Sequence, residues 1–175
     1  MPEKNDALGN DENGDAGRDG SAYFLKYSFP CAGISLAKGQ MNEREFEELK
    51  AAVVAGKGFD EEKLVRMFPN ATRRLKMFAK EKCMKWDDPA LIREYFWVRH
   101  QQIIDKRAEN YEGAPDVVCE LCKVLKASVV KVSGEFATVC FENGKQRNVL
   151  TEIVGELKVG DSVMVHQAHA VEVVE

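Results

Sequence analysis

The side chains best suited to chemistry lie in the last third of the chain. A Cys-x-x-Cys pair, Cys119 and Cys122, is followed by Cys140 and then by a His-x-x-His pair, His166 and His169. Thiolates and imidazoles are common ligands of zinc and iron, and paired thiols at this spacing also form redox disulfides. A Cys-x-x-Cys pair alone is a weak signal, because buried thiols occur at the same spacing. The spacing of the two pairs differs from that of ordinary zinc fingers, so zinc is one alternative among several.

The remaining composition indicates a protein of the cytoplasm. The five cysteines are odd in number and scattered, unlike the disulfide framework of a small secreted domain. The N-terminus has no basic segment followed by an apolar core, and no apolar run approaches the roughly 20 residues that span a bilayer. The net charge of −4 argues against a nucleic-acid partner, which requires a dense basic surface. We therefore expect neither a membrane nor a nucleic acid as a partner.

The sequence shows no set of residues typical of an enzyme. We find no Ser/His/Asp combination, no glycine-rich phosphate loop and no pair of carboxylates placed for acid–base catalysis. The prediction is therefore a protein without catalytic activity. Its chemistry, if any, would be the binding of a metal.

The cysteines and histidines of the C-terminal segment are expected to be positioned by short β-strands. Apolar and polar residues alternate there, and β-branched side chains are frequent. Asn143-Gly144 is a strong hairpin signal, and Val159-Gly160-Asp161 is typical of a turn before the strand that ends at His166. Because closure removes exposed sheet edges, so many short strands predict a small, closed or partly closed barrel.

The segment before the barrel has apolar residues at helical spacing. Asn42 with Glu45 matches a capping box, Asp60 is a second candidate N-cap, and Asp88 precedes a proline that favours a helix start. Pro69 and Asn70 are expected to separate two helices, and the last helix is expected to reach about Glu109. His100 lies on that last helix and is expected to be structural rather than a ligand.

These patterns predict an α+β protein with two domains. Residues 21–110 form an N-terminal antiparallel helical domain, residues 111–116 form a linker, and residues 117–175 form a small OB-like β-barrel. Residues 1–20 are acidic and rich in Gly and Asn, and they are predicted to be a disordered tail.

The motifs of the barrel segment resemble those of the HypC/HupF family of hydrogenase-maturation chaperones. In that family a leading cysteine precedes a valine-rich strand, and a Val-Gly-Asp-x-Val-x-Val-His motif closes the domain. The same order appears here in Cys122, the valine-rich run to Gly134, the Asn143-Gly144 turn, Arg147-Asn-Val149 and the segment Val159 to His166. The resemblance covers roughly the last third of the chain. One difference is that the family's cysteine lies near a chain N-terminus, whereas Cys122 is internal.

The resemblance implies a role in the assembly of [NiFe]-hydrogenase. Family members are implicated in carrying an iron centre with cyanide and carbon monoxide ligands, Fe(CN)2CO, toward the hydrogenase large subunit. Carried over, the iron ligands would be Cys122 and His166, with Cys119 and His169 as additional candidates. A soft thiolate and a borderline imidazole suit such an iron. The implied partners are a HypD-like maturation protein and the hydrogenase large subunit.

Two alternatives remain open from the sequence. In the first, the barrel is repurposed, and the protein is a binding or regulatory module whose recognition surface is an exposed aromatic segment from Tyr23 to Phe29. In the second, the protein is a small zinc protein that uses Cys119, Cys122, His166 and His169.

Overall fold

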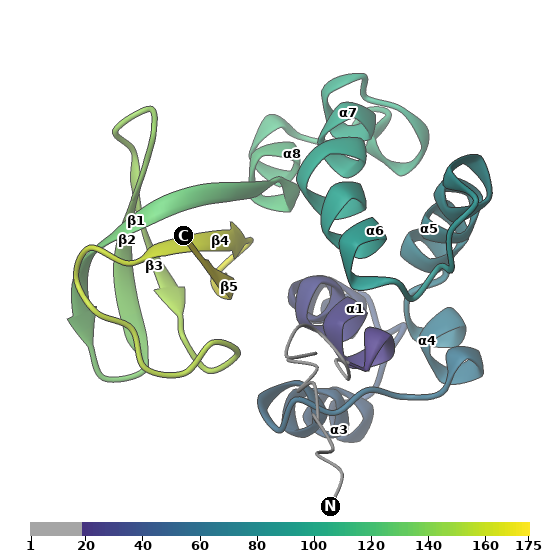
Figure 1. Cartoon of the computed structure of the whole chain (residues 1–175), viewed down its shortest axis with the longest axis horizontal. Coiled ribbons are helices and arrows are strands. Elements are labelled where there is room, and N and C mark those ends of the chain that lie inside the picture. The colour runs from purple at the N-terminus through teal and green to yellow at the C-terminus, as the bar shows by residue number, and fades with distance from the viewer. Residues whose placement is uncertain (1–18) are drawn as a thin grey trace, which may run out of the picture.

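The computed structural model describes residues 19–175, in which a helical part packs against a five-stranded β-barrel (Figure 1). The helix α8 (Asp116–Cys122) leads directly into the first strand, β1 (Val124–Ser133). The predicted α+β class, with helices followed by an OB-like barrel, is confirmed. Within the described residues, no helix combines the length and the apolar character needed to cross a bilayer.

The predicted N-terminal tail falls almost entirely on residues 1–18, which lie outside the described part of the chain. Its last two residues belong to the first helix instead. Asp19 is the N-cap of this helix, and its carboxylate accepts a hydrogen bond from the backbone N–H of Ser21 at 3.0 Å.

The helical part consists of short helices joined by short loops. In chain order these elements are α1 (Gly20–Ser28), the 3-10 turn η1 (Phe29–Cys31), α2 (Ala32–Ala37), α3 (Glu43–Val54), α4 (Glu61–Met67), α5 (Pro69–Lys82), α6 (Pro89–Glu94), the π-helical segment η2 (Tyr95–Arg99), α7 (His100–Asp105), the 3-10 turn η3 (Glu109–Tyr111) and α8.

The helix starts follow the capping signals of the sequence. The capping box of Asn42 and Glu45 is confirmed, with both reciprocal hydrogen bonds present at 2.9 and 3.1 Å. Asp60 and Asp88 also cap helices with their side chains. The expected break at Pro69 is wrong in detail, because Pro69 occupies the first turn of α5 rather than a loop. Proline is well tolerated there, since its missing N–H would have no partner within the helix.

The last long helix of the helical part differs from the prediction. It is continuous from α6 through η2 to α7, but it ends at Asp105 rather than near Glu109. Arg107 and Glu109 have positive φ angles of 51° and 57°, which turn the chain back toward α8. π-Helical segments such as η2 are rare and often lie at functional sites.

The aromatic segment from Tyr23 to Phe29 is buried, so the prediction of an exposed recognition surface there is wrong. Phe24 and Tyr27 are completely inaccessible, and Tyr23 and Phe29 are only 3% and 1% exposed. The reason is the central place of α1, which contacts α3, α6 and the barrel strand β5 (His169–Val174). A helix covered on several sides is apolar on several sides.

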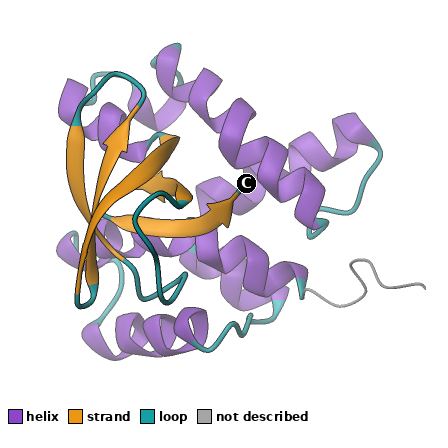
Figure 2. Cartoon of the chain, turned by 60° about the vertical axis from the view of Figure 1, so that its left-hand side comes forward, coloured by secondary structure: helices purple, strands orange, loops and turns teal. Residues whose placement is uncertain are grey.

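The barrel closes in the strand order β1-β2-β3-β5-β4, with β4 pairing back onto β1. Figure 2 shows the strands curled together beside the helices. The remaining strands are β2 (Phe136–Phe141), β3 (Gln146–Leu150) and β4 (Ser162–His166). The pairs are antiparallel except β3 with β5, which is parallel through Leu150 and His169. A bulge in β1 between Val129 and Lys131 lets this strand bend and pair on both of its edges.

The first strand begins later than the barrel segment predicted from residue 117. Residues up to Cys122 belong to α8, so the Cys-x-x-Cys pair is helical, and strand pairing starts at Val124 opposite His166. Gln101 of α7 holds this start. Its side-chain amide accepts a hydrogen bond from the N–H of Val124 at 3.2 Å and donates one to the carbonyl of the same residue.

The helices and the barrel share one apolar core and one buried polar cluster. The core that contains Phe24 and Tyr27 also includes Val124, Met164 and Val171 of the barrel.

The buried polar cluster consists of Glu172 of β5 with Tyr23, Tyr27 and Arg93, and we call it the Glu172 cluster. The carboxylate of Glu172 is 5% exposed and accepts hydrogen bonds from the hydroxyl groups of Tyr23 and Tyr27 and from Arg93 at 2.8 Å. These contacts join α1 and α6 to the barrel.

Removing this carboxylate should destabilise the whole protein. Glu172→Ala leaves the guanidinium of Arg93 and two buried hydroxyl groups without their acceptor, so we expect the free energy of unfolding to fall by about 3 kcal/mol. Denaturant unfolding followed by circular dichroism measures this loss. Glu142→Ala is the control, because Glu142 is exposed on the barrel surface and its loss should leave stability within about 0.5 kcal/mol. Equal losses in the two variants would contradict the prediction.

The Glu172 cluster should also make stability depend on acid. Burial alone would raise the pKa of Glu172, but the hydrogen bonds from Tyr27, Arg93 and Tyr23 outweigh burial and lower it. A carboxyl whose pKa is lower in the folded state stabilises the fold above its unfolded pKa of about 4.3, and this contribution is lost as pH falls through the lowered value. The amide of Glu172→Gln does not titrate. The stability difference between wild type and Glu172→Gln should therefore shrink below about pH 4, and a difference that is constant from pH 3 to pH 7 would contradict this origin.

Candidate functional site

His166 is the end of β4 and is completely buried where the barrel meets the helices. Its ring atom Nδ1 lies 2.7 Å from the backbone carbonyl of Tyr27 in α1. A carbonyl can only accept, so Nδ1 carries the proton, and Nε2 is left as a hydrogen-bond acceptor. A histidine that donates one ring N–H to a backbone carbonyl is oriented as metal-binding histidines usually are.

The side chain that faces Nε2 is Cys31, which the sequence analysis did not single out. Its Sγ lies 3.7 Å from Nε2 of His166, and the side-chain amide of Gln167 donates to the same sulfur at 3.5 Å. Cys31 ends the 3-10 turn that follows α1, next to Pro30. No sequence signal identifies it, because Cys31 and His166 are 135 positions apart and neither lies in a motif with the other.

Cys122, the predicted partner of His166, approaches the imidazole through its backbone, which favours the charged ring and so raises its pKa. It is the last residue of α8, is 5% exposed, and packs in a small core with Ile104, Tyr111 and Cys119. A negative charge on Cys122 would raise the pKa of Cys31, so the two thiols are within electrostatic reach of each other. The structure therefore gathers Cys31, Cys122 and His166 in one region at the junction of helices and barrel.

Burial holds all three groups in their neutral forms. It raises the pKa of Cys31 to about 12, with further raising by Cys122, and the Gln167 hydrogen bond lowers it less. Burial also raises the pKa of Cys122, against a smaller lowering by the Tyr111 hydroxyl. For His166, burial lowers the pKa to about 4, although the Tyr27 carbonyl favours the charged ring. At neutral pH the imidazole is therefore unprotonated on Nε2, and a thiolate would form only with a cation beside it.

A cavity of about 770 Å³ gives access to the two thiols. Cys31 and Cys122 both contribute to its wall, while His166 lies behind them and has no exposed surface. The wall combines apolar side chains with a few polar ones, as small-molecule sites do. The polar residues of interest are Arg74, Tyr95, His100, Asn110 and Tyr111.

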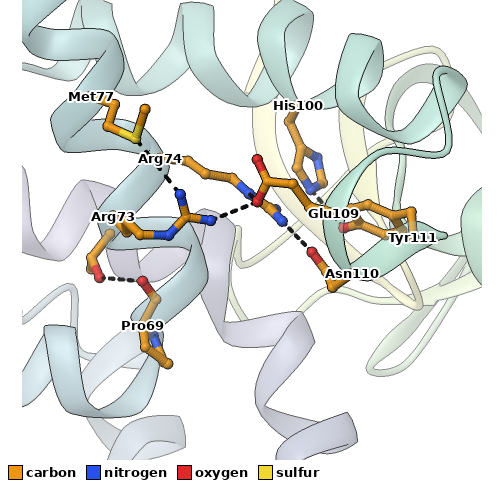
Figure 3. Close-up of polar contacts among 9 residues, drawn as sticks. Pro69, Arg73, Arg74, Met77, His100, Glu109, Asn110 and Tyr111 are labelled. Carbon is orange, nitrogen blue, oxygen red and sulfur yellow. Dashed lines mark hydrogen bonds and ion pairs between the residues drawn. The ribbon is translucent and has the colours of Figure 1, made fainter.

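The polar wall of this cavity is built around the side chain of Arg74, which is only 7% exposed (Figure 3). Its guanidinium donates to Glu109 at 2.8 Å and also to Asn110, and Arg73 donates to the same Glu109 carboxylate at 2.6 Å. This charge balance explains how a buried arginine is retained next to the cavity.

Two groups of the cavity wall lack hydrogen-bond partners. His100 bonds to the hydroxyl of Tyr111 through Nε2 at 3.0 Å, but its Nδ1 has no partner, and the same is true of the Tyr95 hydroxyl. Burial, aided by His166 and Arg74, lowers the pKa of His100 to about 3, so this ring is neutral. His100 is therefore a buried neutral residue, and its Nδ1 and the Tyr95 hydroxyl are enclosed by protein rather than exposed to the cavity.

The additional candidate ligands are placed differently. His169 pairs with Glu152 at 3.6 Å and packs edge-on against Phe29, so its ring belongs to another set of contacts. Cys119 is buried one helical turn before Cys122. Among residues 19–175, no three His, Cys, Asp or Glu side chains are grouped closely enough to hold a metal ion together. The zinc set of four side chains is thus not assembled in the structure.

Comparison with known proteins agrees with the motifs of the barrel. Residues 122–175, about a third of the chain, match the family described as HupF/HypC, and the helical region ahead of them matches no family. No curated protein matches the chain significantly. The match begins at Cys122 and contains His166, the two positions to which the barrel motifs assign the leading cysteine and the closing histidine. The C-terminal β-barrel of this chain is therefore the part that matches the HupF/HypC family.

Proposed function

We propose that this protein is an accessory chaperone of [NiFe]-hydrogenase maturation that carries iron as Fe(CN)2CO and holds it transiently through Cys122 and His166. HupF/HypC family members are chaperones rather than enzymes, and the family match suggests this role for the barrel. A HypD-like maturation protein would supply the cargo or receive it, and the hydrogenase large subunit would be the final acceptor.

The observation that carries the proposal is the state of His166. Its ring is buried and is fixed through Nδ1 by the Tyr27 carbonyl. Its unprotonated Nε2 points toward the thiol of Cys31. Neutral imidazole and thiolate together suit an iron that bears cyanide and carbon monoxide. The Cys31 thiol donates a hydrogen bond to this Nε2, and a metal ion bound to both atoms would replace the thiol proton.

The cavity suits a cargo of this chemistry. Its volume of about 770 Å³ exceeds what a single iron with three diatomic ligands requires, so the remainder could admit a partner's side chain. Cyanide ligands carry negative charge, and the guanidinium of Arg74 in the cavity wall provides a positive charge near them, partly offset by Glu109.

Infrared spectroscopy of the purified protein tests this role directly. The chain is produced in a host that contains the hydrogenase-maturation proteins and is purified without oxygen. We expect about one iron per chain, with infrared bands of iron-bound cyanide and carbon monoxide. Cys122→Ala and His166→Ala should each lose the iron and the bands, because each removes one of the two proposed ligands.

The control is Cys83→Ser, which alters an exposed thiol at the end of α5, remote from the cavity wall. This variant should keep the iron and the bands of the wild type. Wild-type protein without iron under these conditions, or bands that persist in both ligand variants, would contradict the proposed function.

A further inference from the structure

We propose that the helical part contributes a metal ligand of its own, Cys31, which shares a metal ion with His166 Nε2. The proposal rests on the proposed function in that it concerns the same site, and it adds a thiolate that the HupF/HypC barrel does not contain. The ligand class is a soft or borderline divalent metal ion, iron(II) in the carrier role.

The first support is the distance between the two donor atoms. Metal–sulfur and metal–nitrogen bonds are about 2.3 and 2.0–2.1 Å long in protein sites of this type. With Cys31 Sγ and His166 Nε2 3.7 Å apart, one ion bonded to both atoms makes a sulfur–metal–nitrogen angle of about 115°. This angle is close to tetrahedral, so the separation of the two donor atoms is compatible with one shared ion.

The second support is that one short segment positions both donors. The carbonyl of Tyr27 accepts a hydrogen bond from Nδ1 of His166. Four residues later, the sulfur of Cys31 lies against Nε2. Two residues of the segment from α1 to η1 therefore contact the imidazole. Tyr27 fixes the proton on Nδ1, and Cys31 contacts the lone pair of Nε2. Gln167 holds the sulfur from the barrel side at 3.5 Å. Ligands held by such outer contacts lose little conformational entropy when a metal arrives.

Cys122 is the candidate for a third donor in this arrangement. In the part of the chain that is described, it does not complete a three-ligand group with Cys31 and His166, but it lines the same cavity as Cys31. An ion on the Cys31–His166 pair would attract a thiolate of Cys122, because both cysteines line the same cavity. Further ligands of the ion, or a partner's group, would reach it through that cavity.

Proton balance follows from the protonation states. Each thiol that binds the ion releases one proton to solvent as its sulfur–hydrogen bond is replaced by a sulfur–metal bond. The imidazole releases none, because Nε2 carries no proton before binding. No oxidant or reductant is required, and the metal keeps its charge of +2.

The arrangement changes the role of the helical part. A barrel that offers one thiolate and one imidazole leaves several positions of a metal open for its partner. A second thiolate from the same chain occupies one of these positions, so the cargo is held between the helices and the barrel. Transfer to a partner then requires replacing Cys31 as well as Cys122.

Cobalt(II) binding to the metal-free, full-length protein tests the inference, because cobalt(II) reports its thiolate ligands by sulfur-to-metal charge-transfer absorption. Wild-type protein titrated without oxygen should bind one cobalt(II) and show this absorption. Cys31→Ala should lose about half of the charge-transfer intensity, as one of two thiolates is gone, and its affinity should fall at least about 10–100-fold. Cys83→Ser should match the wild type.

A second measurement uses wild-type protein, so its result does not depend on whether the variants fold. Alkylation by iodoacetamide, read by mass spectrometry, should be slowed by cobalt(II) at both Cys31 and Cys122, while Cys83 should react equally with and without metal. Cys31→Ser, which preserves side-chain volume, provides a second variant whose folding is checked by circular dichroism.

The outcomes separate this inference from the proposed function. Cobalt(II) bound with Cys31 as a ligand, but no infrared bands of iron-bound cyanide in cells, would leave a metal site and remove the carrier role. Infrared bands that are unchanged in Cys31→Ala, together with an unchanged cobalt(II) spectrum, would keep the carrier role and overturn the ligand role of Cys31. Wild-type protein that binds no cobalt(II) would also overturn the inference.

Discussion

The hydrogen bond from Nδ1 of His166 to the carbonyl of Tyr27 is the contact on which the site depends. It joins the last residue of a barrel strand to the first helix, and its donor and acceptor are 139 positions apart. An imidazole buried without a partner would cost about 1–3 kcal/mol, so the barrel needs this carbonyl to keep His166 inside. The same bond decides which ring nitrogen is free. The helical part is therefore required for the chemistry of the barrel's histidine.

Local signals predicted most of the elements. The capping box at Asn42 and Glu45 and the hairpin turn at Asn143-Gly144 each involve residues within a few positions, and the structure confirms them. The small barrel of short strands was predicted from the alternation of apolar residues and the family resemblance, but the order in which the strands pair was not. The first residue of the barrel was harder to predict, because α8 ends at Cys122 and β1 begins at Val124, with one residue between them. A helix end and a strand start this close together give no separate signal.

Long-range contacts account for what the sequence did not predict. An apolar run such as Tyr23 to Phe29 has the same composition whether it is exposed for a partner or covered by α3, α6 and β5, and only the tertiary structure distinguishes the two. Cys31 is a similar case. It is one scattered cysteine among five, and its meaning arises only when the turn after α1 meets the end of β4. A search for paired motifs finds Cys119 and Cys122 but cannot find a cysteine that another part of the fold places beside His166.

The strength of the junction restricts how a cargo could leave. The Glu172 cluster and the apolar core shared by α1 and the barrel hold the two parts together, and both would have to be exposed if the parts separated. Exposing them would cost several kcal/mol, more than breaking one metal–thiolate contact in exchange for another of the same kind. Ligand exchange through the cavity requires no such exposure, because Cys31 and Cys122 already line its wall. A partner would therefore reach the metal from the cavity side, replacing one thiolate at a time, while His166 stays fixed by Tyr27 behind it.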